Sequence, residues 1–488
     1  MERVQGDTAG SIGKLAGRGL RWGLFGNLVT RLGSFAMGLV LARLLAPEDF
    51  GLYAVALAAT MFVMSIKDVG IMAAVVQWRG RVEDVTPTAT LVSFVTAMAM
   101  YGLFWVGAPA FSQLAGSEAA TPVVRLLTAV ILVEGFTAIR SAMLLRRFQQ
   151  DVLTKAVAAG FVVNAAVAIV LAAEGAGAYS FAWGQVAAAV VTGVIVLFAA
   201  RMPIRVGFDA PTARSLIAFG IPSAAGVGLE SLLQNAGYIV VGNVMGASWL
   251  GYFLLAFNVS SWVPGLVGNA IRNVAIPGFS RLAEERPEAL SAGVRKAVPL
   301  LVTAVLPLAV VMGVLAHPLI SFLYGDKWGQ SAGVLRWLAI VMVVRMLAAL
   351  AYDALTSQGA TGSTVWMNLG FGIALVPALI LGAHLDGIRG AAIGQAAVSL
   401  LVVLPLAAFF LRRAGVDLRG TLPELIRPLG AGLLAAGVAA LLDRLLVAGD
   451  PLVRLCVAGG GALLVYILAA VPVTQLRRLV PSLSKDPR

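Results

Sequence analysis

The chain has 488 residues, of which 59% are hydrophobic and only 12% are charged, and its mean hydropathy is +0.91. A soluble globular protein carries about 25% charged residues, so this composition excludes an ordinary soluble domain and indicates a protein built for lipid. The net charge of +12 does not indicate nucleic-acid binding, because the basic residues lie at helix ends and in loops and not on one soluble domain. The single cysteine excludes an internal disulfide, and with two histidines it cannot build a metal cluster.

Apolar windows long enough to cross a bilayer recur along the whole chain. A spanning helix needs roughly 20 mostly apolar residues. Hydropathy predicts about 14 such windows, at residues 22–45, 50–77, 88–109, 119–145, 155–173, 178–200, 216–241, 246–275, 297–316, 330–356, 363–383, 389–411, 426–447 and 452–471. The fold class predicted is therefore an all-α polytopic membrane protein with about 14 transmembrane helices.

Lysine and arginine residues are strongly biased towards one set of loops. With the N-terminus in the cytoplasm, about 24 basic residues lie in the termini and the even-numbered connections, against about four in the opposite loops. The positive-inside rule then predicts that both termini are cytoplasmic.

No connection exceeds roughly 20 residues, and loops of this size usually only connect helices, so there is no room for a soluble catalytic domain.

Two segments of the first half recur in the second half. LLAPEDFGLYAVALAAT reappears as VMGASWLGYFLLAFNVS, so that Phe50–Tyr53 aligns with Leu250–Phe253. Val124–Leu127 likewise aligns with Leu335–Leu338. Six helices separate the copies, and because this number is even, both halves face the same way across the membrane. The pattern predicts parallel repeats, related by an axis along the membrane normal, with a central cavity between two lobes.

The repeat divides the chain into two lobes of six helices each and a final helix pair. The lobes comprise residues 22–201 and 216–411, and the pair comprises residues 426–471. The remaining segments, all predicted to be cytoplasmic, are residues 1–21, 202–215, 412–425 and 472–488.

Charged residues inside the apolar windows form the candidate site. A charge at the bilayer centre costs about 2.5–3.5 kcal/mol on insertion scales, so it needs a wet cavity or a partner. Four such residues lie too deep to reach the interface easily, and for them lining the cavity is favoured over a purely structural ion pair: Arg31, Glu134, Glu230 and Arg345. Arg140, Arg272 and Lys67 lie nearer the cytoplasmic interface, and they either line the cavity or snorkel to the surface.

Neighbouring polar residues complete the predicted site. Asn27 lies one turn before Arg31, Gln234 lies one turn after Glu230, and Asp353 lies two turns after Arg345. We predict that substrate is bound by Arg31, Arg140, Arg272, Arg345, Asn27 and Gln234, and that ion coupling uses Glu134, Glu230 and Asp353. The chain has no Gly-rich phosphate loop, HExxH motif or nucleophile elbow, so neither catalytic residues nor metal ligands are predicted.

Four stretches carry a family resemblance. They are LARLLAPEDFGLYA, the DVG that follows it, PGFSRLAEE after the eighth window and LYGDKWGQSAGVLRWLA entering the tenth. In these stretches the chain resembles the Wzx-type polysaccharide transporters of the multidrug/oligosaccharidyl-lipid/polysaccharide exporter superfamily. The resemblance implies export of undecaprenyl-pyrophosphate-linked saccharide units across the bacterial cytoplasmic membrane by alternating access. In the related lipid II flippases, arginines on the first and eighth helices meet the pyrophosphate, and Arg31 and Arg272 lie on those helices here.

The expected protein is thus a transporter for surface or exopolysaccharide synthesis and not an enzyme. No cofactor is expected, and a proton or sodium ion together with the membrane potential are the candidate driving forces. The expected partners are the polyprenyl-pyrophosphate saccharide, the bilayer, a polysaccharide polymerase and glycosyltransferases, but no nucleic acid. The alternatives are a drug/cation antiporter or a lipid II-type flippase of the same fold, and a membrane-embedded glycosyltransferase or polymerase, which the short loops disfavour.

Overall fold

A computed structural model describes residues 26, 30–77, 82–147, 149–202, 207–265, 287–447 and 449–470. These described residues form helices and no strands. Ten segments among them are long and apolar enough to cross a membrane, and one of these, Gly362–Arg413, covers two of the predicted windows. The chain forms two compact units, Met1–Leu254 and Leu255–Arg488. The all-α, multi-pass architecture predicted from hydropathy is confirmed.

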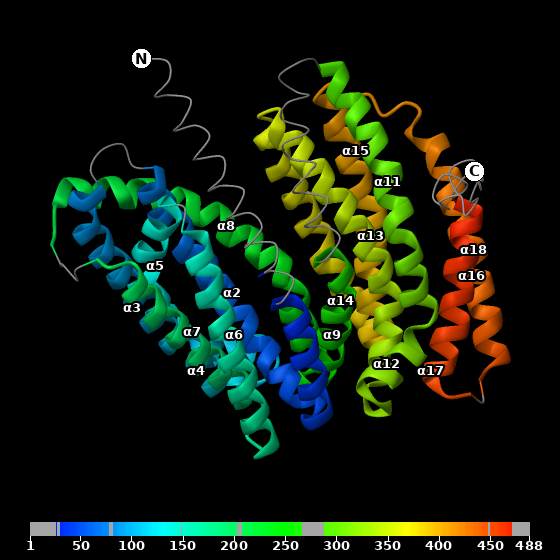
Figure 1. Cartoon of the computed structure of the whole chain (residues 1–488), viewed down its shortest axis with the longest axis horizontal. Coiled ribbons are helices and arrows are strands. Elements are labelled where there is room, and N and C mark those ends of the chain that lie inside the picture. The colour runs from blue at the N-terminus through cyan, green and yellow to red at the C-terminus, as the bar shows by residue number, and fades with distance from the viewer. Residues whose placement is uncertain are drawn as a thin grey trace, which may run out of the picture. The chain divides into compact units, whose positions relative to one another are not determined.

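The helices follow the predicted windows closely in both units (Figure 1). The first unit contains the helical residues 30–44, α2 (Pro47–Gln77), α3 (Val82–Leu114), the 3-10 turn η1 (Glu118–Ala120), α4 (Thr121–Thr128), α5 (Val130–Arg146), α6 (Gln150–Ala173), α7 (Tyr179–Ala199), α8 (Ala210–Met245) and the first half of α9 (Ala247–Ser260). The second unit continues with α11 (Pro287–Val314), α12 (Ala316–Tyr324), the 3-10 turn η3 (Asp326–Trp328), α13 (Gln330–Ser357), α14 (Thr361–Val398), the π-helix η4 (Ser399–Val403), α15 (Leu404–Arg413), α16 (Thr421–Leu445), α17 (Pro451–Arg454), the π-helix η5 (Leu455–Gly459) and α18 (Gly460–Ala470).

The two halves repeat their helix boundaries as well as their sequence. Helix α5 ends at Arg146 and α6 begins at Gln150, whereas α13 ends at Ser357 and α14 begins at Thr361. The end of α13 and the start of α14 follow their counterparts in the first half by the same offset along the chain. That offset also relates the second pair of matching sequence segments. A short 3-10 turn precedes the matched helix in each half. The backbone therefore reproduces the repeat that the sequence predicts.

Helix α14 contains the turn between the eleventh and twelfth predicted windows. Asp386 and Gly387 leave helical geometry there, and Gly387 has a φ of 58°. Glycine adopts this left-handed conformation without the steric cost that a Cβ would impose. The two limbs then pack with their backbones in contact, because a Cβ on Gly382 or Gly390 would overlap the carbonyl group of the other.

Helix α8 has 36 residues and begins six residues before its predicted window, at Ala210. The Asp209 side chain caps it by accepting a hydrogen bond from the Thr212 N–H at 3.0 Å, and Pro211 suits the first turn. Hydrogen bonds from the side chain and the backbone of Thr212 hold the pKa of the Asp209 carboxyl below its usual range. A helix of this length measures about 54 Å at 1.5 Å per residue, so it is tilted or extends beyond a hydrocarbon core of about 30 Å.

Helix α8 is attached to α3 at both of its ends. At the start, the Asp209 N–H donates to Thr88 Oγ1 at 3.1 Å, and Leu216 joins a buried cluster with α3 and α5. At the end, Asn243 Nδ2 donates to the Leu114 carbonyl at 2.7 Å. Between these points α8 slants along α2 (Figure 1). The seventh predicted helix therefore packs on helices of the predicted first lobe, and the lobe boundaries themselves stay a prediction.

The final helix pair packs through small residues. Helices α16 and α18 bury a series of alanines against each other and against α11. Gly459 lies against Leu315, and Gly461 lies against Leu442 of α16. Small residues let neighbouring membrane helices approach closely. The glycine run in this last window therefore serves helix packing, as the sequence predicts.

Candidate functional site

Part of the predicted site lies outside the described residues. Asn27 and Arg272 fall in undescribed ranges, and the same holds for the side chains of Glu230, Gln234 and Lys67. Their roles stay predictions. The described members are Arg31, Glu134 and Arg140 in the first unit, and Arg345 and Asp353 in the second. Within the described ranges, no three His, Cys, Asp or Glu side chains come together as a group that could hold a metal ion.

The first unit presents its predicted site residues in three different environments. Arg31 is exposed on the helix of residues 30–44, whereas Glu134 is half-buried on α5. Arg140 follows Glu134 on the same helix by six residues, which places it about 9 Å further along and on a different face. Of the predicted cations in this unit whose side chains are described, Arg31 is the exposed one.

Arg140 is enclosed by the first unit. It is 3% exposed, and its Nη1 donates to the Phe136 carbonyl at 3.2 Å. Its guanidinium carbon lies 5.2 Å from the centre of the Phe136 ring, and its Nε has no hydrogen-bond partner among the described residues. A snorkelling arginine would extend its charge towards the interface. Arg140 instead folds back on its own helix in this structure, and its predicted role in substrate binding stays a prediction.

We expect Arg140→Met to raise the free energy of unfolding in detergent by about 1–3 kcal/mol, because it removes a buried guanidinium whose Nε has no hydrogen-bond partner among the described residues. Denaturant unfolding followed by circular dichroism measures the change. Arg125→Met is the contrasting variant, since the Arg125 Nε donates to the Trp105 carbonyl at 3.1 Å and its guanidinium carbon lies 4.7 Å from that ring. Arg125→Met should destabilise the protein. A loss of stability in Arg140→Met would contradict this expectation and show that the contacts of Arg140 with Phe136 stabilise the fold.

In the second unit, Arg345 and Asp353 lie on neighbouring faces of α13, eight residues and about 12 Å apart along the helix axis. Arg345 is exposed, and its guanidinium carbon lies 5.2 Å from the centre of the Phe257 ring. Asp353 is only 7% exposed. Beside it, the Tyr352 hydroxyl donates to Asn368 Oδ1 at 2.6 Å and ties α13 to α14. Arg345 therefore presents its charge at the surface of this unit, whereas Asp353 is enclosed.

The first hairpin meets its own repeat copy at a contact that the sequence analysis did not predict. Helix α2 begins at Pro47, and helix α9 begins at the equivalent position of the second copy, Ala247. A Cβ on Gly51 would overlap the Ala247 carbonyl group, and a Cβ on Gly251 would overlap the Pro47 carbonyl group. Equivalent residues thus exchange the same contact, which is the signature of a two-fold axis. We call these four residues the glycine crossing. The sequence signal for it was the glycine shared by both copies of the repeat.

A second backbone contact holds the end of α8 to the corner between α3 and α4. Gly116 has a φ of 86°, and a Cβ on it would overlap the Gly242 carbonyl group. Gly242 in turn lies against the Ala115 carbonyl. No side chain separates the two segments at this point, so the helices approach as closely as their backbones allow.

The two ends of the first unit carry opposite charges. The turns at the end that holds the glycine crossing contain Glu48, Asp49, Glu118 and Glu174. The helix ends and turns at the opposite end contain Arg146, Arg147, Lys155, Arg201 and Arg214 together with Asp151 and Asp209, so this end is basic on balance. Under the positive-inside rule, this distribution predicts that the glycine crossing lies at the outer face of the membrane.

Known proteins share both sequence and fold with this chain. The model of a family described as "Polysaccharide biosynthesis protein" matches residues 40–333. The succinoglycan biosynthesis transport protein ExoT of Rhizobium meliloti (strain 1021) is 24% identical over 368 residues, which are 74% of each chain. The lipopolysaccharide biosynthesis protein WzxC of Escherichia coli (strain K12) is 21% identical over 173 residues, 36% of this chain and 35% of WzxC.

Among solved structures, the lipid II flippase MurJ in an inward closed conformation superposes with a TM-score of 0.77. The match covers 94% of this chain and 99% of that one at 11% sequence identity, so it shows the fold alone. That fold has two lobes, which confirms the predicted fold class. The matched family model covers more than half of the chain and agrees with the resemblance to Wzx-type transporters found in the sequence. The chain belongs to the polysaccharide biosynthesis protein family of multi-pass membrane proteins.

Proposed function

We propose that this protein exports lipid-linked saccharide units across the bacterial cytoplasmic membrane by alternating access, for the synthesis of a surface or exopolysaccharide. The observation that carries the proposal is the glycine crossing, which brings two copies of the repeat into backbone contact at one end. Rocking of one repeat against the other needs a contact that closes one side and can part. Family membership and the names of the similar proteins ExoT and WzxC support the connection with polysaccharides.

The substrate that we propose is an undecaprenyl-pyrophosphate-linked saccharide. Arg31 and Arg345 are exposed arginines on apolar helices. The planar guanidinium binds phosphate oxygens through paired, charge-assisted hydrogen bonds, which suits a pyrophosphate better than a neutral sugar. In this proposal the saccharide and the pyrophosphate occupy the cavity between the lobes, while the polyprenyl tail stays in lipid. Arg140, Arg272, Asn27 and Gln234 are the proposed further contacts.

The driving force that we propose combines the membrane potential with a coupling ion. An inside-negative potential is worth about 2.3 kcal/mol per elementary charge per 100 mV, and it drives anions outwards. The same field draws an emptied, cationic cavity back, so it favours both half-cycles. Glu134, Glu230 and Asp353 are the proposed sites for a coupling proton or sodium ion.

In this proposal the protein performs no catalytic step of its own. Glycosyltransferases assemble the lipid-linked unit on the cytoplasmic side, and a polymerase joins the units on the other side. Both termini face the cytoplasm, as the loop charges predict. The proposed role of the protein is therefore to move a polar head group across the hydrocarbon core.

Flipping of undecaprenyl-pyrophosphate-linked saccharide in proteoliposomes, with pH, sodium and potential varied separately, tests the proposal. We expect flipping to depend on the protein and to rise with a potential that is negative on the cytoplasmic face. The rise is bounded by about 50-fold per 100 mV for each charge moved, the equivalent of about 2.3 kcal/mol. Transport of organic cations without flipping would replace the proposal with a drug/cation antiporter. Sugar transfer from a lipid donor by the purified protein would replace it with a glycosyltransferase.

A further inference from the structure

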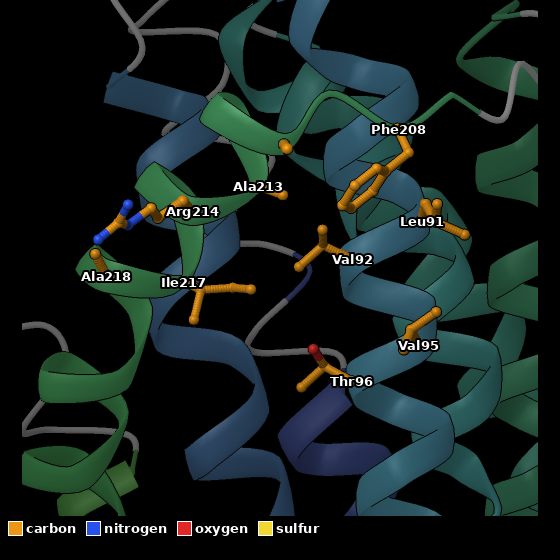
Figure 2. Close-up of a pocket in the computed structure, with 10 residues that line it drawn as sticks. Leu91, Val92, Val95, Thr96, Phe208, Ala213, Arg214, Ile217 and Ala218 are labelled. Carbon is orange, nitrogen blue, oxygen red and sulfur yellow. The ribbon is translucent and has the colours of Figure 1, made fainter.

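A groove of about 550 Å³ lies between α3 and the start of α8 (Figure 2). Its volume falls in the range of about 300–1,000 Å³ that is usual for ligand pockets. One wall is a single face of α3, formed by Leu91, Val92, Val95 and Thr96. The other wall is formed by Phe208 and by two adjacent rows of side chains along the first turns of α8. None of the predicted substrate or ion-coupling residues lines this groove.

The groove is apolar and open to the surroundings of the protein. The exposed fractions of Val95, Ile217 and Phe208 are 54%, 44% and 69%. Residues Val85–Leu114 of α3 are long and apolar enough to span a membrane, so an apolar, exposed face of this helix suits contact with hydrocarbon. Apolar side chains exposed on such a face are expected to contact acyl chains, because transfer of apolar surface from water into hydrocarbon is favourable.

One cation, Arg214, belongs to the lining of the groove. It lies one turn after Ala210 and one turn before Ala218, in the same row of side chains on α8. Its guanidinium lies beside Ala218, at the rim and on the side of α8 away from α3 (Figure 2). Arg214 is exposed, and no residue in the described part of the chain forms an ion pair or hydrogen bond with its side chain. The groove therefore has one positive charge at its rim.

We propose that this groove binds one anionic phospholipid from the adjacent leaflet, with an acyl chain between α3 and α8 and its phosphate on Arg214. The guanidinium fork matches phosphate oxygens, and a basic residue at the membrane surface favours anionic lipid by about 1 kcal/mol. The α8 wall, residues 210–218, is about 12 Å long at 1.5 Å per residue, less than half of the hydrocarbon core of about 30 Å. This length accommodates the upper part of one lipid chain from one leaflet.

Photocrosslinking with the full-length protein in phosphatidylcholine vesicles tests the proposal. The probes are phosphatidylglycerol and phosphatidylcholine, each with a diazirine on the acyl chain, and labelled peptides are identified by mass spectrometry. We expect the phosphatidylglycerol probe to label residues 91–96 and 208–218 about fivefold more than the phosphatidylcholine probe, as about 1 kcal/mol implies. Equal labelling by the two probes would mean that bulk lipid fills the groove, and it would overturn the proposal.

Four variants assign the labelling to the groove and its charge. Arg214→Gln should abolish the preference for phosphatidylglycerol, whereas Arg214→Lys should retain it. Ile217→Trp adds bulk to the lining and should reduce labelling by both probes. Arg413→Gln removes an exposed basic residue at the end of α15 and is the matched control, for which no change is expected. A preference that persists in Arg214→Gln, or displacement of the probe by undecaprenyl phosphate but not by unlabelled phosphatidylglycerol, would contradict the proposal.

Discussion

Gly51→Leu is expected to separate α2 from α9 at the glycine crossing. A side chain on Gly51 meets the carbonyl group of Ala247, and one on Gly251 meets the carbonyl group of Pro47. These are backbone atoms of helices, which cannot rotate aside as the end of a side chain can, so the helices themselves must move apart. Overpacking of this kind costs about 1–3 kcal/mol. The equilibrium between the joined and the parted state should therefore shift by roughly 5- to 150-fold, and flipping should fall with it.

Spin labels at Glu48 and Ser248 measure this separation directly. Both residues are exposed, and they occupy equivalent positions in the two copies of the repeat. Labelling as cysteines in a Cys456→Ser background is specific, because Cys456 is the one cysteine of the chain. The native protein should give one short distance, and Gly51→Leu and Gly251→Leu should each give longer, broader distributions.

The matched control for the glycine crossing is Gly102→Leu, because a Cβ at this helical glycine meets no other atom within 4 Å. It should change neither the distance between the labels nor the rate of flipping. If Gly51→Leu and Gly251→Leu also leave the distance unchanged, the crossing tolerates side chains and is not the contact that parts during transport.

Neutralising Arg31 and Arg345 together is expected to abolish flipping. Hydrogen bonds to charged groups contribute about 1.5–3 kcal/mol each, so two lost arginine–phosphate contacts correspond to roughly 10²- to 10⁴-fold. The measurement is the initial rate of flipping in proteoliposomes by the double variant Arg31→Gln/Arg345→Gln. Full transport by this variant would remove the proposed pyrophosphate site, while leaving the result for the glycine crossing untouched.

Charge-conserving and structural controls separate binding from folding in this experiment. Arg31→Lys/Arg345→Lys should retain part of the activity, because lysine keeps the charge but lacks the planar fork that holds phosphate in two places. Arg125→Gln removes an arginine that binds Trp105 of its own unit. The rate per folded molecule should be unchanged in this control, even where the yield of folded protein falls.

The membrane-spanning helices could be predicted from the sequence because the bilayer leaves few structures that can cross it. Each span must satisfy its own backbone hydrogen bonds, so an apolar window of sufficient length is a helix. The predictions differed from the structure where a local group sets a boundary. Asp209 starts α8 before the apolar window does, and Ala129 interrupts the fourth predicted helix to give α4 and α5. Neither of these helix boundaries changes the mean hydropathy over a window of some 20 residues, so a hydropathy scan does not detect them.

The positions of the candidate site's side chains could not be predicted from the sequence, as Arg140 shows. Its position in the chain was compatible with a cavity or with the interface, but its side chain folds back on Phe136 and is enclosed. The enclosure depends on which faces of α5 its neighbours cover. That information is not contained in the spacing of charged residues along one helix.

The sequence by itself determined the spanning helices, the repeat and the family, because hydropathy, spacing and motif similarity depend only on the order of residues along the chain. Only the tertiary structure decided that Gly51 and Gly251, far apart in the chain, exchange contacts, and that α3 and α8 leave an apolar groove beside Arg214. Both features arise where two backbones cross. The distance between crossing backbones depends on the packing of every helix around them, and no single stretch of residues encodes it.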